Sequence, residues 1–165
     1  MSTTLIKNAT LINEGTQEIQ DVFIVDQFIQ EIGINLDHKA DQIIDASGKH
    51  LIPGLIDDQV HFREPGLTHK ATIASESRAA VAGGITSFIE MPNTNPQTTD
   101  IQALENKFER AAETSLANYS FMFGGTNDNI DEIRKLDKTK VAGLKLFLGS
   151  STGNMLVDDQ AVLRE

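Results

Sequence analysis

Three polar residues at alternate positions, Gln59, His61 and Arg63, follow a short apolar run and are of types that can do chemistry together. On extended backbone, alternate side chains point to the same face, about 6.6 Å from one to the next. A neutral imidazole and a nearby amide oxygen can chelate a metal ion, and a guanidinium beside them suits a carboxylate. The pattern therefore predicts a metal and carboxylate site; the alternative is a surface loop whose alternation is accidental.

A lysine inside an apolar segment is the second unusual feature. Lys145 lies in "VAGLKLFL", residues 141–148, whose other side chains are those of a buried strand. Burying an ammonium group is costly, whereas a neutral lysine amine can react with carbon dioxide to give an anionic carbamate that bridges two metal ions. The alternative is a lysine near the strand end whose ammonium group extends to water. The spacing leaves both interpretations open.

Strands and helices alternate along the chain from residue 51, and these elements must position the residues above. The expected strands lie at 51–57, 85–91, 119–124 and 141–148, and the expected helices at 71–82, 99–117, 128–138 and from 158 onward. Gly83 and Gly84 fit a C-terminal cap of the first helix, and Thr99 or Asp100 fits the N-terminal cap of the second. Repeated strand–helix–strand units imply parallel strands joined by right-handed crossovers.

Two α/β folds suit this alternation, a doubly wound sheet and a (β/α)8 barrel. In both, ligands bind beyond the carboxyl ends of the strands. Asn93 follows the second expected strand and residues 124–127 follow the third, so polar groups gather on the same rim as His61. Four βα units make half of a (β/α)8 barrel, and a complete barrel needs roughly 250 residues. We therefore expect the chain to be truncated.

The first fifty residues have a different sequence pattern. Short runs rich in Ile, Val and Phe, at 4–12 and 21–33, are separated by Asn13-Glu14-Gly15, and a further short run follows at 41–50. No stretch there has a helical pattern of more than a few residues. These features predict a small antiparallel β region.

Composition narrows the class of protein. The net charge of −10 argues against a nucleic-acid or anionic-membrane partner, because both need concentrated positive charge. The chain has no cysteine, which excludes disulfides and thiolate zinc sites and fits a reducing cytoplasm. No stretch approaches the roughly 20 apolar residues of a membrane span, and the N-terminus lacks the pattern of a signal peptide. We expect a cytoplasmic protein with a small-molecule substrate.

Three segments, in this order, resemble the cyclic amidohydrolases of the amidohydrolase superfamily. They are "PGLIDDQVHFREPG" at 53–66, "AAVAGGITSFIEMPNTNP" at 79–96 and "AGLKLFLGSSTG" at 142–153. Within that superfamily, "HFREPG" and "MPNT" are similar to the dihydroorotases more than to the allantoinases and hydantoinases. The resemblance runs over nearly the whole chain.

The resemblance implies a fold and a domain organisation. Members of this family have a (β/α)8 barrel that carries a zinc centre, and a small β-sandwich assembled from both chain ends. We therefore expect residues 1–50 to be N-terminal strands of such a sandwich. Residues 51–165 are expected to be the first four βα units of the metal-dependent hydrolase barrel, in truncated form.

The resemblance also implies roles for single residues. His61 matches the second histidine of the family's His-x-His zinc ligands, and Lys145 matches the lysine that carbon dioxide carboxylates to bridge two zinc ions. Arg63 and Asn93 match the residues that hold the carboxylate and ring of the substrate. Gln59 stands where the first zinc-binding histidine is expected and is a weaker ligand, so the site is expected to hold one or two zinc ions or none.

The implied reaction is the reversible hydrolysis of the cyclic amide of dihydroorotate to carbamoyl aspartate, in pyrimidine biosynthesis. The family's catalytic aspartate lies on a later strand, so no catalytic acid or base is expected within this chain, and the chain alone is expected to be inactive. Gln59 raises an alternative, a non-catalytic relative that serves as a structural partner of aspartate transcarbamoylase. A third possibility keeps the enzyme class but changes the ring, as in an allantoinase or hydantoinase. A homo-oligomer is also left open.

Overall fold

The computed structural model describes residues 1–149 and 154–164 of the 165-residue chain. It divides into two compact units, residues 1–53 and 54–165, which are described separately below. The first unit contains β1 (Thr3–Asn13), β2 (Thr16–Val25), β3 (Phe28–Gly33), β4 (Gln42–Asp45) and β5 (His50–Leu51). The second contains β6 (Leu55–Val60), α1 (Ile73–Ala82), β7 (Ile85–Glu90), α2 (Ile101–Thr114), β8 (Asn118–Gly124), α3 (Ile130–Arg134), β9 (Gly143–Lys145) and a short 3₁₀ turn (Val162–Arg164).

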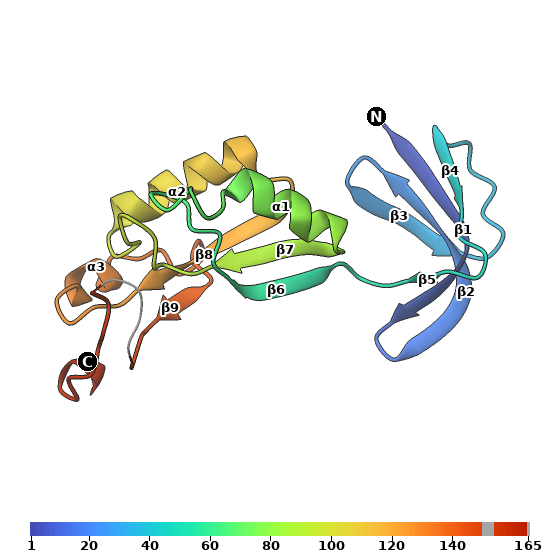
Figure 1. Cartoon of the computed structure of the whole chain (residues 1–165). Coiled ribbons are helices and arrows are strands. Elements are labelled where there is room, and N and C mark those ends of the chain that lie inside the picture. The colour runs from blue at the N-terminus through green and yellow to red at the C-terminus, as the bar shows by residue number, and fades with distance from the viewer. Residues whose placement is uncertain (150–153, 165) are drawn as a thin grey trace. The chain divides into compact units, whose positions relative to one another are not determined.

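The first unit is one five-stranded sheet with the order β3-β2-β1-β4, and β5 also pairs with β1 (Figure 1). Glu14 and Gly15, with φ of 48° and 79°, connect β1 to β2 in the left-handed conformation that two-residue hairpin turns favour. The expectation of an antiparallel region is only partly right, because β4 and β5 run parallel to β1. A parallel pair needs a longer connection than a hairpin, and residues 34–41 supply it for β4.

A buried carboxylate organises the first unit beside its apolar cluster of Leu5, Phe23 and Leu36. Asp21 accepts hydrogen bonds from the backbone N–H groups of Asn8 (2.7 Å) and Leu36 (3.0 Å). The ammonium group of Lys7 lies 3.1 Å from the same carboxylate. Every oxygen of this buried group is therefore used.

The second unit is built on a parallel sheet with the strand order β6-β7-β8-β9. Figure 1 shows α1 and α2 side by side on one face of this sheet. The core lies between these two layers and consists of one cluster, namely Val60, Phe62, Ile73, Phe88, Leu104, Ala111, Ala117, Phe121 and Phe123. Successive strands joined by helices on one face are the arrangement expected of consecutive βα units of a barrel.

The ends of the two longer helices follow from their sequences. Thr72 accepts a hydrogen bond from the Ser75 N–H, and the Ser75 hydroxyl reciprocates, which forms a capping box at the start of α1. Asp100 caps α2 by accepting from the Ala103 N–H at 2.7 Å. Gly83 ends α1, and Gly84 follows with φ of 91°, as the sequence predicts.

Several elements are shorter than expected. Leu51 pairs with β1 in the first unit, and the strand of the second unit starts only at Leu55, after Pro53 has removed a backbone donor. The last expected strand is reduced to Gly143–Lys145, because a turn in which Asp137 accepts from Thr139 precedes it. The helix expected from residue 158 is a turn and a short 3₁₀ segment, and its final residue lies outside the described range.

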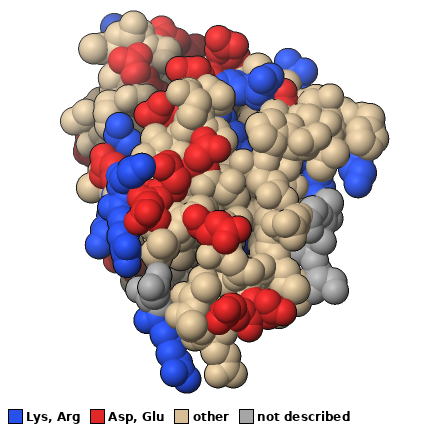
Figure 2. All heavy atoms as spheres, turned by 90° about the vertical axis from the view of Figure 1, so that its left-hand side faces the viewer, with Lys and Arg blue, Asp and Glu red and all other residues tan. Residues whose placement is uncertain are grey.

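The exposed charges are mixed in sign. On the face shown in Figure 2, Asp and Glu side chains are interspersed with Lys and Arg side chains. The ion pairs Arg134–Asp131 (3.4 Å) on α3 and Lys135–Glu132 (2.7 Å), which joins α3 to the residue directly after it, are of this exposed kind. Within residues 1–149 and 154–164, no helix is both long and apolar enough to span a membrane.

Candidate functional site

The end of β6 and the residues directly after it carry three of the predicted site residues. Val60 and Phe62 are buried in the core beneath the helices, so Gln59 and His61 lie on the opposite face of the strand, and both are exposed. β6 ends at Val60, and Arg63 has a left-handed backbone with φ of 69°. The expectation that one extended strand presents all three side chains is therefore wrong, since the alternation covers only the first two.

His61 and Asn93 contact each other across 32 positions of sequence. The Nδ1 atom of His61 lies 2.9 Å from the Oδ1 atom of Asn93. An amide oxygen only accepts, so this contact places the proton on Nδ1 and leaves Nε2 with a free lone pair. Although much of the His61 side chain is exposed, desolvation of its ring lowers its pKa; the charges of Arg63 and Lys145 lower it further, and the Asn93 contact opposes the shift. The shift favours the neutral form of the ring, the form that binds metals or accepts protons.

Arg63 is half-buried beside His61. Its Nη1 atom is fully buried and has no hydrogen-bond partner among the described residues. Buried polar groups are nearly always paired, so an orphaned guanidinium nitrogen indicates a position for a ligand. The forked guanidinium is the group best suited to a carboxylate.

Two rim segments, residues 61–66 after β6 and residues 91–96 after β7, hold each other. The Asn95 N–H donates to the Pro65 carbonyl at 3.1 Å, and the Met91 N–H donates to the Val60 carbonyl at 3.0 Å. A side chain at Gly66, whose φ is 81°, would overlap the Asn95 carbonyl oxygen. The two segments therefore approach closely only because residue 66 is glycine.

Glu64 ties the first rim segment to both helices. Its carboxylate is buried, accepts from the Ile73 N–H at the start of α1 (2.7 Å) and lies 3.2 Å from Arg110 of α2. A carboxylate at a helix N-terminus is stabilised by the unpaired N–H groups there. Sequence reasoning missed this role, although an acidic residue between the polar site and a helix start is a usable signal.

Lys145 is the last residue of β9. It is half-buried rather than buried, and its ammonium group lies 5.3 Å from the centre of the Phe147 ring. Its backbone carbonyl accepts from the Gly125 N–H at 3.0 Å, which connects the ends of β8 and β9. Its positive charge lowers the pKa of His61. Both residues lie at the carboxyl ends of strands of one parallel sheet, since His61 follows β6 and Lys145 ends β9.

The donor set can serve as part of a metal site. In residues 1–149 and 154–164, no three His, Cys, Asp or Glu side chains gather closely enough to hold a metal ion by themselves. The free Nε2 of His61, oriented by an amide oxygen on the other nitrogen, is typical of a metal-binding histidine. A carbamate on Lys145 would add an anionic oxygen donor, and the Gln59 amide is a weaker one.

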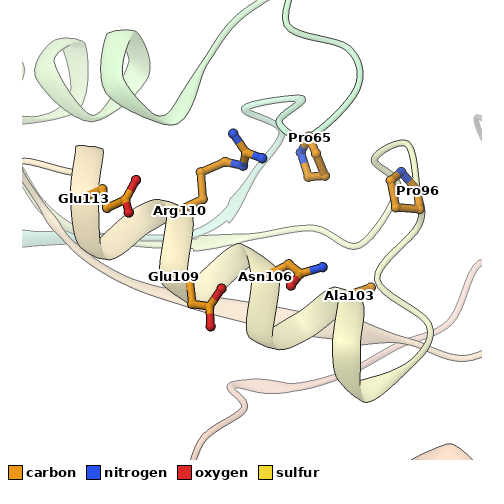
Figure 3. Close-up of a pocket in the computed structure, with 7 residues that line it drawn as sticks. All are labelled: Pro65, Pro96, Ala103, Asn106, Glu109, Arg110 and Glu113. Atoms are coloured by element: carbon orange, nitrogen blue, oxygen red, sulfur yellow. The ribbon is translucent and has the colours of Figure 1, made fainter.

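A hollow of about 340 Å³ lies behind the rim, between α2 and the two rim segments (Figure 3). Pro65 and Pro96 contribute one wall, and Asn106, Glu109 and Arg110 of α2 contribute the other. None of the predicted site residues lines this hollow. It marks where the two rim segments meet α2.

Two buried charges beneath the rim were also missed by sequence reasoning. Glu90 at the end of β7 and Lys107 in α2 are 0% and 1% exposed, and their charged atoms are 2.8 Å apart. Lys107 occupies the apolar stripe formed with Leu104, Phe108 and Ala111 at spacings of three and four residues. A charged residue within an apolar helical stripe is the sequence signal that could have identified Lys107.

Comparisons with known proteins identify the family. Residues 48–155 match the family model described as dihydro-orotase-like. The chain is 34% identical over 157 residues to a dihydroorotase of Methanosarcina mazei, an alignment that covers 94% of this chain and 34% of that protein. It is 37% identical over 147 residues to an allantoinase of Escherichia coli O1:K1 / APEC, covering 88% of this chain and 32% of that protein.

A solved structure shows the same fold. The L-hydantoinase (dihydropyrimidinase) of Arthrobacter aurescens superimposes with a TM-score of 0.88 and 30% sequence identity, covering 95% of this chain and 35% of that one. The predicted fold class, a partial (β/α) barrel preceded by a β-rich part, is thereby confirmed. The chain spans about a third of the length of the curated relatives it matches.

Proposed function

The chain belongs to the dihydro-orotase-like family of cyclic amidohydrolases, and from that membership we propose that it forms part of a zinc-dependent dihydroorotase. The proposed reaction is the reversible hydrolysis of the ring amide of dihydroorotate to carbamoyl aspartate. The observation that carries the choice of substrate is the buried, unpartnered Nη1 atom of Arg63. Dihydroorotate has a carboxylate on its ring, which suits that guanidinium; allantoin and the simple dihydropyrimidines have none.

Arg63 would bind the ring carboxylate and so fix the orientation of the scissile amide. Two parallel N–H···O bonds from a guanidinium set direction as well as distance, and orientation of this kind accounts for much of the catalytic advantage of a bound substrate. The left-handed backbone at Arg63 turns its side chain away from the strand direction. The Leu67 N–H, which donates to the Arg63 carbonyl at 3.0 Å, stabilises this turn.

Asn93 would have two functions in this site. Its Oδ1 atom fixes the tautomer of His61, as described above. The contact with His61 uses only the oxygen of this amide, which leaves the Nδ2 amino group available to donate to an oxygen of the substrate ring. Asn93 itself is buried, which holds the amide in place.

His61, carboxylated Lys145 and the weaker Gln59 would hold the zinc. The carbamate forms when the lysine nitrogen bonds to the carbon of carbon dioxide and releases one proton. A zinc ion bound there supplies polarisation of the ring carbonyl and a water molecule acidic enough to attack near neutral pH. The general acid or base that completes the reaction is not assigned to any residue of this chain.

Zinc content tests this proposal. The longest form of the protein found in its source should be purified with bicarbonate present and its zinc per chain measured by elemental analysis. Near two zinc ions per chain are expected, falling to one or fewer in Lys145→Ala; Lys140→Ala, an exposed lysine on the preceding turn, is the control. No zinc in the unaltered protein would contradict the proposal and favour a non-catalytic structural partner.

An allantoinase is the second candidate, because relatives with that name match this chain as well as the dihydroorotases do. The two candidates differ in whether the substrate carries a carboxylate for Arg63. Turnover of allantoin that is unaffected by Arg63→Ala would favour the second candidate.

A further inference from the structure

We propose that Glu90 and Lys107 form a buried positioning pair that holds the two rim segments, and with them Arg63 and Asn93, in the arrangement the substrate requires. The inference rests on the proposed function only for the identity of the substrate. Neither residue would touch the substrate, because both lie on the helix side of the sheet.

The location of Glu90 is the first argument. Glu90 and Phe88 alternate with Ile89 along β7, and Phe88 is in the core cluster between sheet and helices. The Glu90 side chain therefore points toward α2 and away from the open face of the sheet. Glu90 is also the last residue of β7, directly before the rim segment 91–96.

The contacts of Lys107 are the second argument. Its ammonium group lies 2.8 Å from a Glu90 oxygen and donates to the Met91 carbonyl at 3.1 Å. It also lies 5.3 Å from the centre of the Phe121 ring, which packs below it. Thus one side chain of α2 binds both the end of β7 and the first residue of the segment that carries Asn93.

The backbone between the two rim segments completes the connection. The Met91 N–H donates to the Val60 carbonyl at 3.0 Å, and the Asn95 N–H donates to the Pro65 carbonyl at 3.1 Å. Lys107 thus holds the residue with which segment 91–96 begins, and that residue is bonded to the end of β6, directly before segment 61–66. Burial raises the pKa of Glu90, and the charge of Lys107 opposes that shift.

The pair is a poor device for stability alone. Both Glu90 oxygens are buried, and neither accepts a well-aligned hydrogen bond from the described residues. Buried ion pairs in which hydrogen bonds are incomplete can usually be replaced by apolar side chains of similar size without loss of stability. The hydrogen bond from Lys107 to the Met91 carbonyl gives a reason for its presence that stability does not.

Two variants test the proposal. Glu90→Leu/Lys107→Met removes both charges and the bond to the Met91 carbonyl, whereas Glu90→Gln keeps Lys107 and that bond. Leu104→Ala, a buried apolar change on the same helix, controls for general loss of stability. Amide hydrogen exchange at Met91 and Asn95, whose N–H groups donate to Val60 and Pro65, reports the two rim segments, and Gly83 at the end of α1 reports the rest of the unit.

In Glu90→Leu/Lys107→Met, exchange at Met91 and Asn95 should accelerate at least about tenfold relative to Gly83. Glu90→Gln should keep exchange at Met91 slow, and Leu104→Ala should change all three amides alike. Unchanged relative exchange at Met91 and Asn95 in the leucine–methionine variant would overturn the proposal. So would equal acceleration at Gly83, since that result indicates a purely structural pair.

Binding of L-dihydroorotate to the same proteins separates this inference from the proposed function. If the unaltered protein binds it, affinity should fall at least about tenfold in Glu90→Leu/Lys107→Met and remain unchanged in Leu104→Ala. Binding that is equal in the unaltered protein and the double variant would overturn the positioning role while leaving the function standing. If the unaltered protein does not bind it, the proposed function fails, and the exchange rates still decide the positioning role.

Discussion

Each of the two units contains one buried carboxylate paired with a lysine, and the two pairs are built differently. In the first unit, Asp21 accepts from two backbone N–H groups within its own sheet and loop, and Lys7 remains partly exposed. In the second, Glu90 and Lys107 are both fully buried and the carboxylate lacks aligned donors. The first pair stabilises the backbone next to it. The second connects α2 to the start of the segment that carries Asn93.

This difference indicates how burial should be interpreted. A carboxylate whose hydrogen bonds are complete stabilises the backbone that provides them. A buried pair whose hydrogen bonds are incomplete contributes little net stability, and its contacts are better evidence of what it positions. The predictions below ask whether the two pairs behave as differently as their contacts suggest.

The largest effect is expected from Lys107→Met. This change leaves the Glu90 carboxylate buried without its counter-charge, which costs roughly 3–5 kcal/mol. Urea unfolding, followed by NMR signals of α1 and α2, should show the loss in residues 54–165. Addition of Glu90→Leu should recover most of it; a double variant as unstable as the single one would mean that the pair itself stabilises the unit.

Asp21→Asn should have a smaller effect, confined to the first unit. The neutral amide keeps one acceptor but loses the charge that attracts Lys7 and holds two N–H groups, at a cost of about 2 kcal/mol. Signals of β1 and β2 should report the loss on urea unfolding, and those of α2 should not. An unchanged midpoint for β1 and β2 would show that the hydrogen bonds of Asp21 are dispensable.

Acid should destabilise the first unit through Asp21. The Asn8 N–H, with Lys7 and the Leu36 N–H, holds the pKa of Asp21 below its usual value of 3.8. Its stabilising contribution is therefore complete above the unfolded-state pKa and is lost as the pH falls through the lower, folded-state pKa. The first unit should lose stability below about pH 4, and Asp21→Asn should weaken that dependence. Equal acid sensitivity in protein and variant would contradict this.

The smallest effect is expected from Lys135→Ala on α3. Its ion pair with Glu132 is only 2.7 Å long, but both groups are at the surface, where water and salt screen the interaction. The unfolding midpoint should be unchanged within experimental error in both units. A clear loss would show that distance, and not burial, determines the value of an ion pair in this protein.

Much of the second unit is predictable from local patterns. The strand–helix alternation, the Asp100 cap and the Gly83-Gly84 ending are set by side chains within a few residues, and the sequence contains them all. The parallel pairing of β4 and β5 with β1 is not predictable from local patterns, because it depends on how far the connecting segment reaches. The sequence also predicts too long a strand at β9, since the turn at Asp137 competes with the strand.

The site was predictable in its residue types and less so in its geometry. His61 and Asn93 are both visible as polar groups at strand ends, but their 2.9 Å contact follows only from strand order and pairing. The left-handed backbone at Arg63 has no sequence signal, because arginine is not a residue that favours it. Glu90 and Lys107 have a signal, a charge within an apolar pattern, whose partner only the fold identifies.

The most direct test of the proposed function is substrate preference in the longest form of the protein found in its source, with zinc and bicarbonate supplied. Hydrolysis of L-dihydroorotate, allantoin and dihydrouracil should be compared in the unaltered protein and in Arg63→Ala. We expect dihydroorotate to have the highest kcat/KM and Arg63→Ala to lower that value about a hundredfold or more, because a buried charge-assisted contact is lost. Preference for a ring without a carboxylate, or full activity in Arg63→Ala, would contradict the proposal.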